Sequence, residues 1–276
     1  MSEKRSGSLG LREFGESVVF SHEGGAFLLD VAGRDDVAEL ARLNLSVKLN
    51  MAHFEKLLLS DDATGFAHRG GFFKVMDAEA LKRCIDESHS IIFVLRELGD
   101  RKDGEGLSGG RIVASFWVSL DDPGFVPPSS SFARYLEKHP VLTGALAQGK
   151  VCYGRELIVA RDAPKFMSPS MAIFCGAFHT MQKAGFGYAL SEVYRLAGYC
   201  VGTDVFGADI ANEAALHMVA EAKGFRIARN ELRTLDFDEG LSVTIEPLAV
   251  LFDFAVTLRG LGNWLVEQEV EVQEVQ

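Results

Sequence analysis

The strongest structural signal in this chain is a pair of apolar segments, Ser90–Leu98 (SIIFVLREL) and Arg111–Leu120 (RIVASFWVSL). Both are rich in the β-branched and aromatic residues that favour strands. Between them, Gly99–Gly110 is a run of glycines and charged residues, which is typical of a hairpin loop. We therefore expect the two segments to pair as antiparallel strands, which commits the middle of the chain to a β-sheet.

Further strands and helices are expected on both sides of this pair. The remaining strand-like segments are Ala26–Val31, Val151–Arg161, Phe225–Ala228 and Leu241–Ile245. The helical segments are Val37–Leu45, Ala78–Glu87, a helix from Ser168 that ends at Gly185, and Ala211–Lys223. Tyr188–Leu196 fits either a strand or a short helix. This order of elements predicts an α+β (α/β) fold in which helices lie on a mixed sheet.

Helical spacing indicates which side chains are buried. In Val37–Leu45, the expected inward face consists of Val37, Leu40, Ala41 and Leu45. In the helix from Ser168, it consists of Met171, Phe174, Phe178 and Met181. Asp77 is placed to cap the helix that follows it.

A single domain is expected over residues 26–262, because neither an internal repeat nor a linker divides the chain. Residues 1–25 look like a flexible N-terminal segment, and residues 263–276 look like an acidic, disordered C-terminal tail. The segment near 121–150 holds four of the seven prolines and a serine triplet, and we interpret it as an insertion.

The charge balance narrows the classes of partner. With 28 basic and 39 acidic residues, the formal net charge of −11 argues against nucleic acid and anionic membranes as partners. No apolar stretch approaches the ~20 residues of a membrane span, and the polar start of the chain does not resemble a secretory signal. A cytoplasmic protein is expected. The four cysteines and seven histidines show no metal-ligand spacing, so no metal is expected.

Three segments resemble the GCN5-related N-acetyltransferase (GNAT) superfamily, whose members transfer an acyl group from a CoA thioester, usually to an amine. They are Ala32–Leu43 (AGRDDVAELARL), the run from Arg155 to Val193, and Asn212–Phe225 (NEAALHMVAEAKGF). The resemblance implies a mostly antiparallel central sheet flanked by helices, with acetyl-CoA or another acyl-CoA as co-substrate and a small-molecule amine as acceptor. It leaves room for a homodimer.

In this family a strand leads into a loop, Q/R-x-x-G-x-G/A, and the loop amides and the following helix N-terminus hold the CoA pyrophosphate. Here Arg155–Arg161 matches the strand, and Lys165–Ser170 (KFMSPS) takes the place of the loop. Serine replaces both glycines, and Pro169 removes one N–H donor. A rival alignment places the loop at Gln182–Gly187, with Tyr188–Ala197 as a short helix and Cys200–Ala208 as the strand.

We prefer the first alignment because its helix has the expected length. The resemblance then implies that CoA is bound by six residues: Val159, Arg161, Lys165, Ser168, Ser170 and Asn212. From Lys150 to Lys165 the chain has four basic and two acidic residues, a local excess that suits an anion site. Asn212 equally fits a plain helix N-cap.

Acyl transfer needs a base for the amine and a polarised thioester carbonyl. Glu156, on the strand beside the expected thioester, is the first candidate base, and Glu192 is the second. Glu156 could equally be a carboxylate paired with an arginine. The tyrosine acid that usually lies four residues before the Gly-Phe pair is replaced by Ala220.

The leading hypothesis is therefore an acyl-CoA-dependent N-acyltransferase, most simply an N-acetyltransferase. Because the loop glycines and the tyrosine are replaced, a catalytically inactive GNAT-fold binding module is the alternative. A third reading is transfer from acyl carrier protein, as in the autoinducer synthases that Arg155–Arg161 resembles.

Overall fold

The computed structural model describes residues 17–48, 75–87, 90–98, 110–119, 140, 144–145, 148, 150–196, 199–201, 225–229, 233–236 and 242–275. For residues 191–251 it describes the backbone alone. Asn212, the expected helix Ala211–Lys223 and nearly all of the insertion near 121–150 lie outside the described residues.

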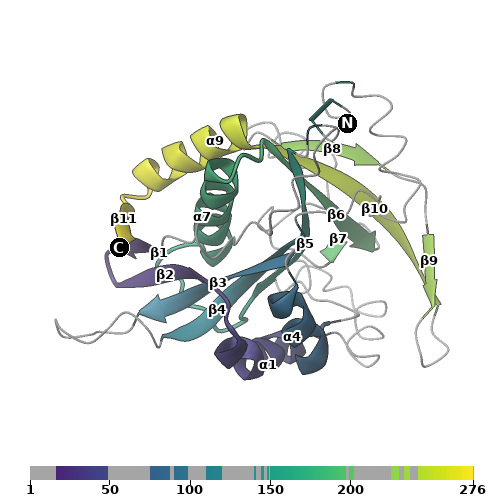
Figure 1. Ribbon diagram of the computed structural model, residues 1–276, viewed down its shortest axis with the longest axis horizontal. Helices are drawn as coiled ribbons and strands as arrows, with labels where there is room; N and C mark the ends of the chain where they lie inside the picture. The colour runs from purple at the N-terminus through teal and green to yellow at the C-terminus, as the bar shows by residue number, and fades with distance from the viewer. Residues whose placement is uncertain are drawn as a thin grey trace, which may run out of the picture.

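The described strands form one eleven-stranded sheet with the order β11-β1-β2-β3-β4-β5-β6-β10-β8, to which β7 and β9 add beside β6 and β10 (Figure 1). Their bounds are β1 Ser17–His22, β2 Gly25–Val31, β3 Ser90–Leu98, β4 Arg111–Ser119, β5 Val151–Val159, β6 Tyr188–Leu196, β7 Tyr199–Val201, β8 Phe225–Arg229, β9 Arg233–Asp236, β10 Ser242–Asp253 and β11 Glu271–Val275. Every described pair is antiparallel except β5 with β6. The expected mixed, mostly antiparallel sheet is confirmed.

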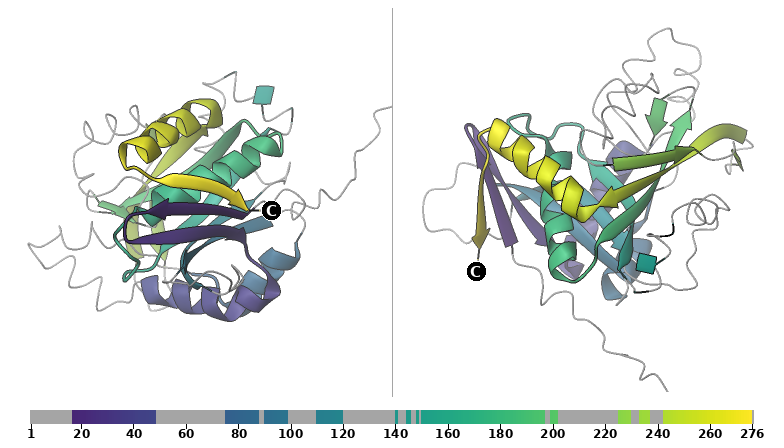
Figure 2. Two further views of the ribbon diagram at one scale, coloured as in Figure 1. Left: turned by 90° about the vertical axis from the view of Figure 1, so that its left-hand side faces the viewer. Right: turned by 90° about the horizontal axis from the view of Figure 1, so that it is seen from above.

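Helices cover both faces of this sheet. They are α1 Val37–Val47, α4 Ala78–Asp86, α7 Pro169–Lys183 and α9 Phe254–Glu267, with a 3-10 turn, η2, at Arg34–Asp36. Figures 1 and 2 show α7 and α9 on one face and α1 and α4 on the other. Each layer has its own apolar core against the sheet. No helix in these described ranges is both long and apolar enough to cross a bilayer.

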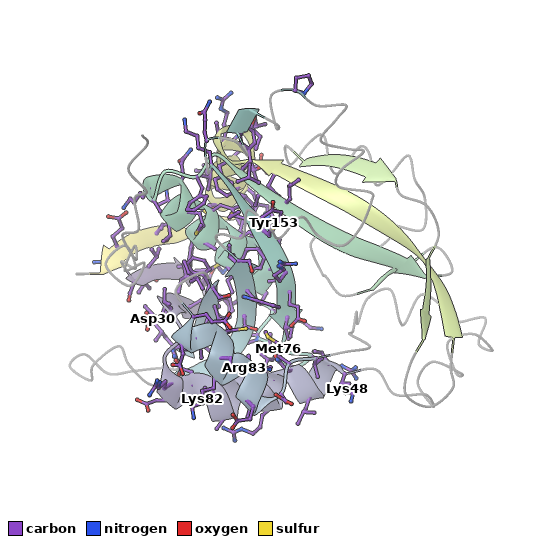
Figure 3. The ribbon with its side chains drawn as sticks, turned by 45° about the vertical axis from the view of Figure 1, so that its right-hand side comes forward. Asp30, Lys48, Met76, Lys82, Arg83 and Tyr153 are labelled. Carbon is purple, nitrogen blue, oxygen red and sulfur yellow. The ribbon has the colours of Figure 1, made fainter. Side chains whose placement is uncertain are left out.

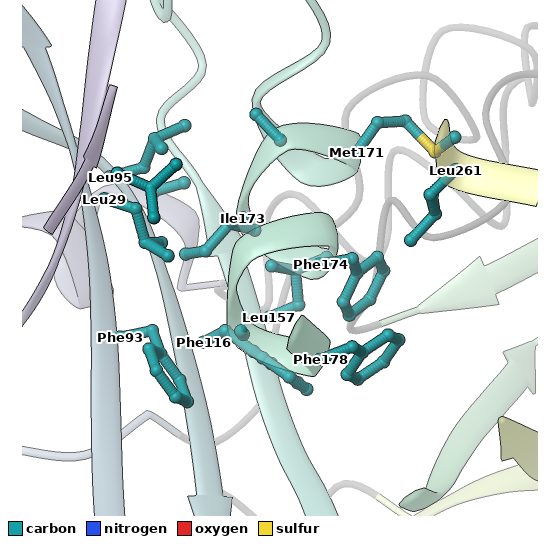
Figure 4. Packing of buried hydrophobic residues seen from close by; sticks show 14 of the residues in the cluster. Leu29, Phe93, Leu95, Phe116, Leu157, Met171, Ile173, Phe174, Phe178 and Leu261 are labelled. Atoms are coloured by element: carbon teal, nitrogen blue, oxygen red, sulfur yellow. The ribbon is translucent and has the colours of Figure 1, made fainter. Parts of the chain in front are cut away.

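The larger core lies under α7, as its apolar spacing predicts. Phe174 and Phe178 stack on each other with ring centroids 5.1 Å apart, and both meet the edge or face of Phe116 on β4. Figure 4 shows Ile173 on the other side of the same helix, turned toward Leu29 of β2. Met171 and Met181 are buried as expected.

The smaller core lies under α1 and α4. Asp77 caps α4 as predicted, its Oδ1 accepting from the Ala80 amide at 2.8 Å. In α1 the prediction is wrong for Leu45, which is 63% exposed, while Leu43 and Val47 are buried. The helix continues to Val47, and its contact stripe against the sheet is rotated toward these two residues.

Both expected flexible ends are partly wrong. Ser17–His22 forms β1, which pairs with β2 on one side and with β11 on the other. The supposed tail continues α9 to Glu267 and then forms β11. Residues 271–274 of this edge strand are exposed, and Lys183 Nζ donates to Glu274 Oε1 at 2.8 Å.

Candidate functional site

The site is built where β5 and β6 separate. The two parallel strands pair only from Val151 to Gly154 on β5 and from Tyr188 to Ser191 on β6. Beyond this point β6 stays with β10, while β5 stays with β4 (Figures 1 and 3). Because α7 starts after the far end of β5 and runs back across the sheet, its N-terminus lies at the open end of this divergence.

A β-bulge marks the point of separation. Trp117 of β4 pairs with Glu156, but its neighbour Val118 pairs with Gly154, so Arg155 is the extra residue. The Arg155 guanidinium lies 5.8 Å from the ring centroid of Trp117 and 5.7 Å from that of Tyr153. Bulges of this kind re-aim side chains, and here the bulge changes which face of the sheet the following residues meet.

Glu156 follows the bulge directly. Its Oε2 is buried and has no hydrogen-bond partner among the described residues. Burial raises the pKa of this carboxyl to about 7, because the charged form loses water without gaining a counter-charge. A carboxyl with this pKa takes up and releases a proton near neutral pH, as a general base must. The structure thus does not support the reading of Glu156 as an ordinary arginine-paired carboxylate.

The free edge of β5 lies beyond Glu156. The Ala160 amide donates to the Val113 carbonyl of β4 at 2.8 Å. Since backbone groups alternate along a strand, Ile158 also faces β4, whereas Leu157 and Val159 turn their N–H and C=O groups to the opposite edge. No described strand pairs with β5 there. An extended ligand with amide groups can add to such an edge.

The N-terminus of α7 has features that favour an anion. Ser168 is the N-cap, Pro169 occupies the first turn, and the Ser168 side chain makes no capping bond to the helix. Its Oγ lies 3.1 Å from Ser170 Oγ instead. Ser170 is only 4% exposed, whereas Lys165 and Arg161 are exposed in the preceding loop. Amides of the first turn and the helix dipole favour an anion here.

The structure contradicts the rival alignment of the loop. Tyr188–Leu196 is a strand, not the short helix that the rival alignment needs. Gln182–Gly187 lies at the C-terminal end of α7, where carbonyls rather than amides are left unpaired. The rival alignment is therefore wrong, and the segment before α7 is the one that faces the open end.

For the other expected site residues, the structure gives less detail. Val159 is half-buried at the end of β5. Glu192 lies on β6 directly after Ser191, the last residue that pairs with β5. Asn212 lies outside the described ranges. Within the described part of the chain, no cluster of three or more His, Cys, Asp or Glu side chains could hold a metal.

Three contributors were missed by sequence reasoning. They are the bulge at Arg155, the ring of Trp117 beside it, and the contacts that hold the loop before α7. A signal for the bulge was present, because an isolated glycine such as Gly154 inside a strand often marks one. The side of the sheet that Glu156 faces depends on this bulge.

Comparison with known proteins gives similarity in structure only. No protein-family model matches the chain, and no curated protein matches it significantly in sequence. Among solved structures, the GNAT domain of S. lividans PAT is 13% identical, with 87% of this chain and 97% of that chain covered at a TM-score of 0.44.

Mycobacterium smegmatis RimJ in complex with CoA-disulfide is also 13% identical, with 95% and 98% covered at a TM-score of 0.46. The protein yncA from Salmonella typhimurium, solved with its cofactor acetyl-CoA, is 8% identical, with 82% and 94% covered at a TM-score of 0.41. Two of these similar structures hold CoA ligands. At such identities and TM-scores, they assign neither substrate nor activity to this chain.

Proposed function

We propose that this protein transfers an acyl group from a CoA thioester to a small amine, most simply as an N-acetyltransferase. The observation that carries the proposal is Glu156. Its Oε2 is buried and has no hydrogen-bond partner in the described part of the chain, its pKa is raised to about 7, and it lies where β5 and β6 separate. Unpaired buried carboxyls cost stability, and they cluster at sites that use them chemically.

The three parts of the site fit one extended ligand. The anionic end of CoA would lie at the α7 N-terminus beside Ser168 and Ser170. Its amide-containing arm would run along the free edge of β5. At 3.3 Å per residue, the strand from Val159 back to Glu156 is about 10 Å long. An arm that lies along this edge would therefore place the thioester beside Glu156 at the bulge.

The chain's own groups then have distinct roles. Glu156 accepts a proton from the attacking amine as its nitrogen bonds to the thioester carbonyl carbon. The Leu157 N–H faces the open edge and is placed to donate to the carbonyl oxygen, on which negative charge develops. When the C–S bond breaks, the CoA thiolate leaves and takes a proton from water, since Ala220 occupies the position of the family's tyrosine acid.

Binding and turnover test the proposal separately. Addition of CoA or acetyl-CoA should raise the melting temperature, because a ligand of the native state stabilises it. Acetyl-CoA should release free thiol in the presence of a panel of primary amines. Glu156→Gln should lower kcat about 10²-fold and leave the Kd for CoA nearly unchanged. Glu79→Gln, on the exposed side of α4, is the matched control and should behave as wild type.

A second candidate is a CoA-binding module without catalysis. The replacement of both loop glycines by Ser168 and Ser170 favours it. It predicts the same shift in melting temperature with no thiol release from any amine. Transfer from acyl carrier protein predicts turnover with acyl carrier protein and neither binding nor turnover with acyl-CoA. If CoA, acetyl-CoA and acyl carrier protein all leave the protein unchanged, the acyltransferase proposal is wrong.

A further inference from the structure

The loop that joins β5 to α7 is held in place by residues of other strands. No glycine occurs from Ala160 to Cys175, so the backbone of this loop cannot adopt the conformations that only glycine tolerates. Side-chain contacts with other strands must then set its position. Two such contacts are present, one near each end of the loop.

Arg111 makes the first contact. From the start of β4, its Nη1 donates to Asp162 Oδ2 at 2.5 Å, and its Nη2 donates to the Asp162 carbonyl at 3.2 Å. Nη2 also reaches Glu97 Oε2 on β3 at 3.2 Å. Asp162 is 76% exposed and lies three residues before Lys165. Its carboxylate would repel an anion at the loop, and Arg111 both compensates that charge and fixes the backbone.

Phe166 makes the second contact. Its ring stacks on Phe27 of β2, with centroids 4.6 Å apart and planes inclined by 29°. The ring lies directly on Gly25, where an added Cβ would come within 2.6 Å of Phe166 Cε1. Only glycine at position 25 therefore leaves room for the ring. The turn between β1 and β2 thus serves as a seat for the loop.

We propose that Arg111 and Phe166 are positioning residues of the CoA site, and that their contacts replace the glycines that such loops usually carry. This inference rests on the proposed function. A loop that is already held in its binding conformation loses less conformational entropy when the anion binds. The two contacts act by different means, since Arg111 supplies charge and Phe166 supplies shape.

The charge of Arg111 is tested by rescue. Arg111→Gln should raise the Kd for CoA about five- to tenfold at low ionic strength, because Asp162 is left uncompensated near the anion. The double variant Arg111→Gln with Asp162→Asn should recover most of this loss. Glu97→Gln, which removes the other partner of Arg111, is the control and should change the Kd less than twofold. The effect of Arg111→Gln should shrink at about 1 M salt.

The seat of Phe166 is tested by a double-mutant cycle. Gly25→Ala and Phe166→Ala should each raise the Kd for CoA about tenfold, and the double variant should be no worse than Phe166→Ala alone. Gly262→Ala, where an added Cβ meets nothing within 4 Å, should bind CoA as wild type does. Without ligand, hydrogen exchange of residues 161–168 should be faster in Gly25→Ala and in Phe166→Ala than in wild type. Gly262→Ala should leave it unchanged.

The outcomes separate the inference from the proposed function. If wild type binds CoA and these variants bind it equally well, the positioning roles are wrong. If Asp162→Asn fails to rescue Arg111→Gln, the charge role is wrong. If wild type binds no CoA, the proposed function fails. Independently of CoA, unchanged hydrogen exchange in the variants would show that the contacts of Arg111 and Phe166 do not hold the loop.

Discussion

Two partly buried acidic side chains in this protein have opposite environments. Asp36 on the 3-10 turn forms an ion pair with Arg96 at 2.7 Å, and its second oxygen accepts from the Gly33 amide at 2.8 Å. Glu156 has a buried oxygen with no partner among the described residues. The first arrangement satisfies a buried charge, and the second leaves one unsatisfied. Stability lost in this way at a single residue is typical of a functional position.

The raised pKa of Glu156 makes stability depend on pH. Burial raises the pKa of this carboxyl from its ordinary value of 4.5 to about 7 in the folded protein. Between these values the folded state holds a proton that the unfolded state has released, so stability falls as pH rises from 4.5 to 7. Glu156→Gln removes this loss. At pH 8 the free energy of unfolding of the variant should exceed that of wild type by an amount on the order of 2–3 kcal/mol. At pH 4 the two proteins should differ little.

Urea unfolding at both pH values measures this difference. Glu79→Gln is again the control, because its parent side chain is exposed and its substitution should leave the pH dependence intact. A Glu156→Gln protein that tracks wild type from pH 4 to pH 8 would show that the pKa is not raised. The same substitution should therefore gain stability and lose turnover.

At the scale of elements, α7 packs closely on β2 at Gly176. An added Cβ at Gly176 would overlap Leu29 Cδ2 and lie 3.4 Å from Phe20 Cζ. Gly→Ala inside a helix normally stabilises by about 1 kcal/mol. Gly176→Ala should instead destabilise by about 1–3 kcal/mol, because the helix must lift from the sheet.

Gly262→Ala in α9 provides the matched comparison. It makes the same chemical change in a helix with open space around the added Cβ, so it should stabilise by about 0.5–1 kcal/mol. Thermal and urea unfolding of the two variants give the sign directly. Stabilisation by both substitutions would mean that α7 does not lie this close to β2.

Most elements were predictable because their signals are local. The strands Ser90–Leu98 and Arg111–Ser119, the cap at Asp77 and the helix after Ser168 follow from composition and spacing. Tyr188–Leu196 was ambiguous, and its pairing with both β5 and β10 decides it for a strand. Leu45 was assigned to the wrong face because the angle at which α1 meets the sheet is a tertiary property.

The candidate site was only partly predictable for the same reason. Glu156 and the segment before α7 could be identified by resemblance to a family. The bulge at Arg155 depends on how β4 and β5 register with each other, which one strand's sequence does not specify. The contacts of Arg111 and Phe166 join residues about 50 and 140 positions apart, respectively, and no local pattern reports them.

At the scale of the whole molecule, the first and last described strands, β1 and β11, pair at one edge of the sheet. β11 pairs with β1 over five residues, and β1 pairs in turn with β2, whose first residue is the seat of Phe166 (Figure 2). Lys183 and His179 on α7 both lie within ion-pair distance of Glu274 on β11. The C-terminal strand thus supports the edge of the sheet that holds the loop before α7.

Removal of β11 should therefore destabilise the protein. Deletion of residues 271–276 removes five cross-strand pairs and exposes the edge of β1. At about 0.2–1 kcal/mol per pair, the loss should be about 1–5 kcal/mol, with increased aggregation through the new edge. Glu274→Gln removes only the exposed ion pairs and should leave the stability nearly unchanged, because such pairs contribute little. Calorimetric unfolding of the two variants separates the strand ladder from the charges. Equal stability of the deletion variant and wild type would mean that β11 is not part of the folded sheet in solution.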